Sequence, residues 1–165
     1  MNITTTIVKA MRYKTVGDWT FDDFGNLQIQ VLDTGNEQYN TLIAVHELVE
    51  ASLCRFAGIT SEQVDEWDMK APFANGDGPY TAGCPYLMQH NCAEMIERSV
   101  CTWMELSWEV YSDFIDKMEI PVWSSLPAPP APTREIPAAV MFCECENDWT
   151  DGTAFCQQCQ KLRVI

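Results

Sequence analysis

Each of the two histidines in the chain is followed, four residues later, by a glutamate. The pairs are His46 with Glu50 and His90 with Glu94. Residues four apart lie about 40° apart around an α-helix, so each pair occupies one helical face, one turn apart. Neutral imidazole together with carboxylate suits zinc, manganese or iron. Two such helices packed face to face would therefore supply four ligands to a metal ion.

Two further glutamates accompany these pairs. Glu97 lies within about 20° of His90 around the helix but two turns along it, so we expect it to serve a second metal ion more easily than the same one. Glu47 projects about 100° from His46 and is the candidate general base for a metal-bound water. The alternative interpretation is a simple helical hydrogen bond within each pair, which stabilises a helix by only a few tenths of a kcal/mol.

Hydrophobic periodicity predicts the helix that carries the first pair. Apolar residues recur at steps of three and four over residues 42–56, and Gly58 is suited to a left-handed cap at the end of this helix. The recurring apolar residues are Leu42, Val45, Val49, Leu53 and Phe56. Of these, we expect Leu42, Val49 and Leu53 to point into the core. His46 shares this face, so the metal site is expected inside the protein.

Two more helices are predicted downstream. Thr60 and Gln63 have the spacing of a capping box, which predicts a short helix from that point. A longer helix, carrying the second pair, is predicted over residues 87–118. The aromatic residues expected to pack in the core from this helix are Trp103, Trp108, Tyr111 and Phe114.

The first 35 residues predict strands instead of helices. Leu27, Ile29 and Val31 alternate with glutamines, which is the period-two pattern of a half-buried strand. Residues 19–21 form a second apolar run, and residues 22–26 have the composition of a turn. We therefore predict an α+β fold, in which a small N-terminal antiparallel sheet packs on two or three helices.

Four cysteines near the C-terminus predict a structural zinc site. Cys143 and Cys145 are followed, after ten residues, by Cys156 and Cys159. Four thiolates complete a tetrahedral zinc site, and a segment of this size needs the metal in order to fold. Two disulfides, or four unpaired thiols, are the alternatives. Residues 151–162 resemble the second half of a short zinc ribbon, although the first pair is Cys-x-Cys and not Cys-x-x-Cys.

Prolines separate this segment from the rest of the chain. Six of the nine prolines lie between Pro121 and Pro137, a density typical of a semi-rigid linker. We therefore predict an α+β body over residues 1–120, a linker over residues 121–137 and a zinc ribbon over residues 138–165.

The charge of the chain limits its partners. The formal charge is −14, and the body, with 7 basic and 19 acidic residues, accounts for most of it. Binding to a phosphate backbone needs clustered Lys and Arg, so a broad nucleic-acid surface is excluded. No apolar run approaches a membrane span, and the start of the chain does not resemble a signal peptide. We expect a cytoplasmic protein with reduced thiols and a protein partner from phage or host.

The segment His46-Glu-Leu-Val-Glu50 resembles the His-Glu-x-x-His helix of the zincin metallopeptidases. In that family two histidines hold zinc and the intervening glutamate activates water. The resemblance implies a metal-dependent hydrolase of peptide bonds, with Glu47 as the base. Glu50 stands where the family has its second histidine, and His90 or Glu94 would supply the third ligand.

Residues 10–116 also resemble a group of small phage and prophage proteins that have no established activity. Their likeness covers Gly17-Asp-Trp19, the His46–Glu50 segment and residues 90–98. It implies a phage-encoded protein in the cytoplasm of a bacterial host.

Two other interpretations stay open. The spacing of Glu47 with Glu50, and of Glu94 with Glu97, resembles the carboxylate arrangement of the MazG-like nucleotide pyrophosphohydrolases, which use magnesium and are all-helical. The other interpretation is a phage protein without catalytic activity, whose metal ions only stabilise the fold and whose acidic body binds a basic host protein.

Overall fold

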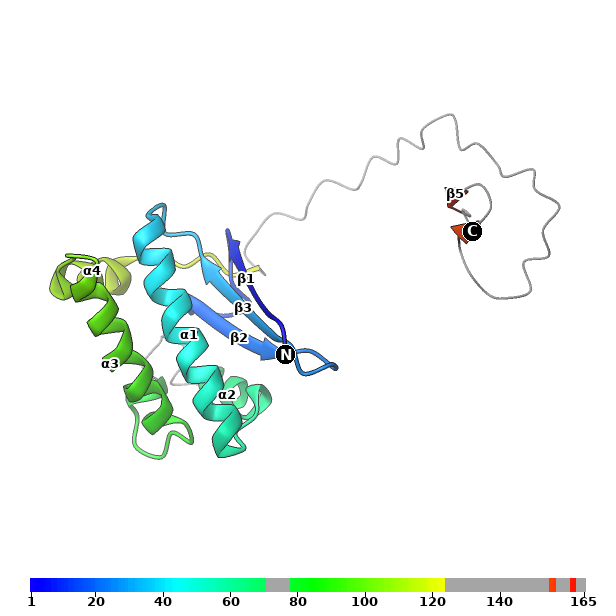
Figure 1. The fold of residues 1–165 in the computed structure, drawn as a ribbon. Coiled ribbons are helices and arrows are strands. Elements are labelled where there is room, and N and C mark those ends of the chain that lie inside the picture. Colours follow the sequence, from blue (N-terminus) through cyan, green and yellow to red (C-terminus); the bar gives the residue numbers. More distant parts are fainter. Residues whose placement is uncertain (71–77, 124–154, 157–160, 163–165) are drawn as a thin grey trace. The chain divides into compact units, whose positions relative to one another are not determined.

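The computed structural model describes residues 1–70, 78–123, 155–156 and 161–162. Figure 1 shows the arrangement of its elements. The strands are β1 (Ile3–Val8), β2 (Gly17–Phe21), β3 (Leu27–Leu32), β4 (Phe155–Cys156) and β5 (Lys161–Leu162). The helices are α1 (Glu37–Ala57), α2 (Ser61–Asp68), the 3₁₀ turn η1 (Gly78–Tyr80), α3 (Leu87–Trp103) and α4 (Trp108–Lys117). The predicted α+β class is confirmed, and the described residues form four α-helices in place of two or three.

The N-terminal sheet has the strand order β1-β3-β2. β2 and β3 form an antiparallel hairpin, and its turn is closed by Asp22, whose carboxylate accepts hydrogen bonds from the N–H groups of Phe24 and Asn26. β1 pairs with β3 in parallel. The prediction of a wholly antiparallel sheet is therefore wrong for β1. The chain between β1 and β2 passes across the sheet, so that β3 lies between them.

Helix α1 lies between the sheet and α3 (Figure 1). Trp19, Ile29 and Val31 of the sheet share one buried cluster with Leu42 and Ile43 of α1. The C-terminal end of α1 is formed as the sequence predicts, since Gly58 has the left-handed φ of 73° and caps the helix. Thr60 and Gln63 form the predicted capping box of α2. Because α1 packs against the sheet on one side and against α3 on the other, its side chains contact both of these layers.

The buried face of α1 differs from the predicted one. The buried residues of the helix are Leu42, Ile43, Glu47, Glu50, Ala51 and Cys54. Of the residues predicted to point into the core, Leu42 is buried but Val49 and Leu53 are only half-buried, and Phe56 at the end of the apolar series is 89% exposed. α3 packs along α1, and Ala51 of α1 and Ala93 of α3 are both fully buried. Helix packing and not apolar periodicity alone sets which face is inside.

The predicted helix over residues 87–118 is two helices. α3 ends at Trp103, and Glu105 then takes a left-handed φ of 59°. Ser107 starts α4 by accepting a hydrogen bond from the N–H of Val110. This break leaves Trp103 79% exposed, against prediction, but brings Tyr111 of α4 back into the core. A single straight helix would carry Tyr111 away from α1.

The chain divides into two compact units, Met1–Pro127 and Ala128–Ile165. The boundary falls within the predicted proline-rich linker. In the second unit, β4 and β5 pair in antiparallel fashion. In the described ranges, no helix combines the length and the apolar character needed to cross a bilayer.

Candidate metal centre

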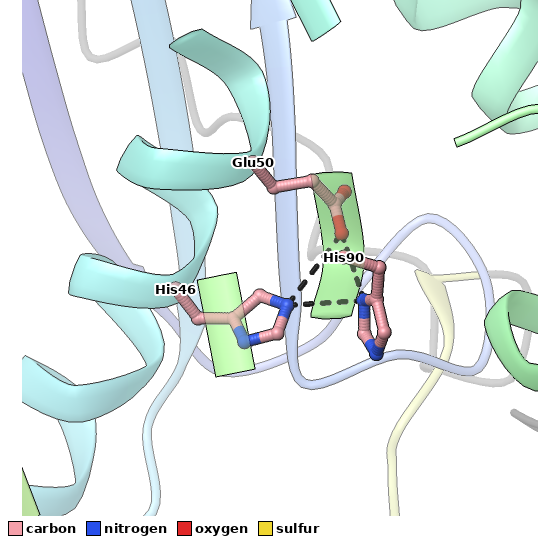
Figure 2. A group of neighbouring side chains, drawn as sticks. All are labelled: His46, Glu50 and His90. Atoms are coloured by element: carbon pink, nitrogen blue, oxygen red, sulfur yellow. Dashed lines mark hydrogen bonds and ion pairs between the residues drawn. The ribbon is translucent and has the colours of Figure 1, made fainter. Parts of the chain in front are cut away.

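Three potential metal ligands converge between α1 and α3 (Figure 2). His46 Nε2 lies 3.1 Å from His90 Nδ1. Glu50 Oε2 lies 2.8 Å from His90 Nδ1 and 3.5 Å from His46 Nε2. Ligands of a tetrahedral zinc ion, bound at roughly 2.0–2.1 Å, stand roughly 3.3 Å from one another. The three atoms are therefore spaced as three corners of such a site.

The two helices place these side chains by simple geometry. His46 and Glu50 extend from one face of α1, one turn apart (Figure 2). His90 extends from the first turn of α3, which packs along α1. The predicted convergence of His46, Glu50 and His90 is therefore present in the fold. This group can hold a metal ion, with a fourth position left to water or substrate.

His46 is oriented from behind by Glu97. Its Nδ1 lies 2.8 Å from Glu97 Oε2, and the hydroxyl of Tyr111 donates to the other oxygen of the same carboxylate. When Nδ1 donates its proton to Glu97, Nε2 presents a lone pair to the centre. A carboxylate behind a histidine ligand is the usual arrangement around protein-bound metals. Glu97 thus contacts the candidate ligand His46, where the sequence suggested that it serves a second metal ion.

Glu50 is oriented from the sheet. The indole Nε1 of Trp19, a buried residue of β2, donates to Glu50 Oε1 at 3.0 Å. This contact leaves Oε2 directed toward the two histidines. Sequence reasoning did not identify Trp19 or Tyr111 as site residues. Both are aromatic residues with a polar atom, and burial of such a residue usually requires a hydrogen-bond acceptor nearby.

Glu94 lies outside the group. It pairs with Arg98 of the same helix and accepts a hydrogen bond from the hydroxyl of Tyr80 at 3.2 Å. Residues seven apart on α3 follow nearly the same direction, so His90 and Glu97 both reach α1. Glu94 is rotated about 40° from His90 and about 60° from Glu97, and its side chain is half-buried.

The charges of the centre favour a cation. Burial opposes ionisation of Glu50, but hydrogen bonds from His46 and His90 outweigh it and lower its pKa to about 2. Burial also opposes ionisation of His46, which by itself would lower its pKa. The contacts of His46 with Glu50 and Glu97 outweigh this effect and raise the pKa well above its ordinary value. The carboxylates thus attract positive charge into a buried site, whether a proton or a metal ion supplies it.

Glu47 is buried beside this centre on the side of β2. Its residue is 9% exposed, and a Cβ atom on Gly17 would stand 2.2 Å from its Oε1. No hydrogen-bond donor among the described residues contacts its carboxyl group. Burial, followed by the charge of Glu50, raises the pKa of Glu47 well above its ordinary value. Glu47 is therefore a proton-holding group next to the three candidate ligands.

Two spaces border the centre and share His46, Glu47 and His90 in their linings. A polar cavity of about 70 Å³ is lined by Gly17, Trp19, Glu47, Glu50 and both histidines, among others. A groove of about 600 Å³ extends outward from His46, Glu47 and His90 toward α4. The inner cavity has room for an ion with one or two waters. The groove is of the size that holds a small ligand or part of a larger one.

The predicted zinc ligands of the C-terminal segment fall almost entirely beyond the described ranges. Cys143, Cys145 and Cys159 are outside them, and of Cys156 the structure gives only its place in β4. The tail site therefore stays a prediction from the sequence.

Comparison of the chain with protein-family models, with curated proteins and with solved structures gives no match.

Proposed function

We propose that the protein is a metal-dependent hydrolase whose ion is held by His46, Glu50 and His90. The observation that carries the proposal is the convergence of three donor atoms, from two helices, within 3.5 Å of one another at the inner end of a groove. Three protein ligands with one open position are typical of catalytic zinc, whereas structural zinc usually has four.

The chemistry of the ligands selects the ion. Two imidazoles and one carboxylate suit zinc, iron or manganese. Magnesium prefers oxygen ligands and retained waters, and usually avoids such a set. The site therefore supports a hydrolase with a transition metal over a magnesium-dependent pyrophosphohydrolase of the MazG-like kind.

The residues around the ion divide the work of hydrolysis. A divalent transition metal supplies a water whose pKa is lowered toward neutrality. Glu47 faces the same cavity and would accept the proton of that water, because a nearby cation favours its ionised form. Glu97 forms a hydrogen bond with His46, and Trp19 donates one to Glu50. These two contacts keep the ligands in place during the reaction.

The groove favours a substrate without phosphates. Its walls include apolar side chains from several elements, among them Val16, Ile43, Trp108 and Ile115. Among the described residues that line it, Lys14 is the only Lys or Arg, and Glu94 and Asp116 add negative charge. A nucleoside polyphosphate would be repelled there. A neutral or cationic substrate with an apolar part, such as a peptide, fits the lining better.

Metal content tests the site directly. The full chain is purified, and its bound zinc, iron and manganese are measured per chain by elemental mass spectrometry. His90→Ala should lose one equivalent, and Cys159→Ser should lose the separate equivalent predicted for the tail. Asn91→Ala, an exposed neighbour on α3, is the matched control. If His90→Ala retains the metal content of the native chain, the proposed site does not exist.

Activity tests the role of Glu47. The metal-loaded chain is incubated with a library of unstructured peptides, and cleavage is followed by mass spectrometry. Glu47→Gln should keep the body metal and lose at least a hundredfold in rate, the range usually found for general bases. Release of pyrophosphate from nucleotides, with no peptide cleavage, would favour the other class of enzyme.

A further inference from the structure

β1 forms an open edge of the sheet. Among the residues that the structure describes, it pairs with β3 on one side only, and Ile3 through Ile7 are all exposed. β2, at the opposite edge, is buried or half-buried at every residue. Exposed edge strands usually carry a charge, a proline or a bulge that prevents pairing with another chain. β1 has none of these within Ile3–Val8 and pairs with β3 without interruption.

The outward backbone groups of β1 belong to its odd-numbered residues. The carbonyl groups of Asn2 and Val8 accept hydrogen bonds from the N–H groups of Leu27 and Asp33, so the even-numbered residues face β3. In a parallel pair, the alternate residues direct both backbone groups to the other side. Three residues of β1, namely Ile3, Thr5 and Ile7, therefore present N–H and C=O groups to the open edge.

We propose that β1 pairs with β1 of a second copy of this chain, in antiparallel fashion, about a twofold axis at Thr5. This register places Ile3 opposite Ile7 of the second copy, and Thr5 opposite its own equivalent. Each opposed pair exchanges two hydrogen bonds, so all three outward residues of both copies are satisfied. A shift by two residues leaves Ile3 or Ile7 without a partner in β1. The two sheets join into one of six strands.

The side chains fit the same register. The segment Ile3-Thr-Thr-Thr-Ile7 is identical when written in reverse, which is the self-complementarity that a twofold interface requires. Ile3 and Ile7 are 48% and 47% exposed, although they lie on the sheet face that packs against α1. In the paired sheet each isoleucine lies beside an isoleucine of the other copy. Cross-strand pairs of β-branched residues stabilise sheets.

Charge also favours this edge for contact between two copies. Two chains of charge −14 repel each other over most of their surfaces. β1 contains no charged residue, and the lysine that follows it, Lys9, is paired with Asp33. Pairing through β1 therefore brings together a neutral part of two acidic molecules. An unrelated extended peptide would gain the same backbone hydrogen bonds but not the matched order of side chains.

Sedimentation of the full chain over a range of concentrations tests the dimer. The native chain should sediment as a dimer that dissociates on dilution. Thr5→Lys opposes two like charges across the axis and should raise the dissociation constant at least tenfold. Thr102→Lys, at an exposed threonine of α3, is the control and should leave it unchanged. A monomeric native chain, or a dimer indifferent to Thr5→Lys, overturns the proposal.

Cross-linking tests the register and does not depend on a destabilising variant. Opposed residues of this type have Cα atoms about 5.5 Å apart, within the range that a disulfide spans. Thr5→Cys under a mild thiol oxidant should give a dimer linked through the introduced cysteines, identified by peptide mass. Thr4→Cys should not, because residue 4 lies opposite residue 6 of the second copy. Equal cross-linking of both variants, or of neither, contradicts the register. The result is independent of metal binding and hydrolysis.

Discussion

The interface between α1 and α3 and the contact between α1 and β2 both bury carboxyl groups, but they treat them differently. At the first, Glu50 and Glu97 each accept hydrogen bonds from at least two side chains. At the second, Glu47 packs against Gly17, and no donor among the described residues contacts it. A buried carboxylate stays ionised only where donors or cations compensate the lost water. The first region therefore favours a bound cation, and the second favours a bound proton.

Removal of Glu50 should have the largest effect, because it breaks the first region at its centre. Glu50→Ala leaves the Trp19 indole and both histidines without their shared acceptor. We expect the free energy of unfolding to fall by about 3–5 kcal/mol and the body metal to be lost. Denaturant unfolding and metal analysis measure the two effects. Glu66→Ala, at an exposed glutamate of α2, should change the free energy by less than about 0.5 kcal/mol. A similar loss of unfolding free energy in Glu50→Ala and Glu66→Ala would show that Glu50 has no special structural role.

Removal of the Tyr111 hydroxyl tests whether a hydrogen-bond donor to Glu97 contributes to stability and metal affinity when the three candidate ligands are unchanged. Tyr111→Phe leaves one oxygen of the buried Glu97 without its donor and loosens the orientation of His46. We expect a loss of about 1–3 kcal/mol in the free energy of unfolding and a metal affinity 10–100-fold weaker. Tyr39→Phe is the matched control, because that ring packs 5.0 Å from Tyr111. Unchanged affinity in Tyr111→Phe would show that Glu97 needs no second donor.

Gly17→Ala tests the second region. The added Cβ would stand 2.2 Å from Glu47 Oε1 and 2.7 Å from its Cγ, so the whole side chain must move. We expect hydrolysis to fall at least tenfold, a loss of about 1–2 kcal/mol in the free energy of unfolding, and retention of the metal. Metal analysis and peptide cleavage on the same sample separate the two regions. Loss of metal together with activity would mean that the two regions cannot be separated.

The sequence predicts the candidate metal ligands better than the residues that form hydrogen bonds with them. His46 and Glu50 share a face of one helix, and a period of 3.6 residues is enough to show it. Packing of α3 against α1 then decides that Glu97 and not Glu94 reaches His46. The sequence alone could not show which of these two glutamates contacts His46, because the answer depends on how α3 packs against α1.

The parts of the fold that the sequence did not predict depend on contacts distant in the chain. The break before α4 needs the Ser107 cap and the left-handed Glu105, and it brings Tyr111 to Glu97. The parallel pairing of β1 depends on a crossing between strands that local periodicity does not encode. Local patterns such as the Thr60–Gln63 capping box were predicted in full.

Asp68 is an intermediate case between the two regions and should show the smallest effect. Burial raises its pKa to about 6, although the Tyr86 hydroxyl donates a hydrogen bond to it. Its folded-state pKa therefore lies above the value of about 3.9 expected in the unfolded chain. The folded state binds the proton more tightly, so the associated stability is present below about pH 4 and is lost as the pH rises through 6.

Comparison of the native chain with Asp68→Asn isolates this contribution. Between pH 4 and pH 6, the free energy of unfolding of the native chain should fall relative to that of the variant. The relative change should be about 1 kcal/mol, since solvent screens this partly exposed group. Denaturant unfolding of both proteins at several pH values measures it. A difference that stays flat with pH would mean that Asp68 ionises as an exposed carboxylate does. In that case, the opposite directions of the pKa shifts of Glu50 and Glu47 could not be attributed to the number of hydrogen-bond donors around each carboxyl group.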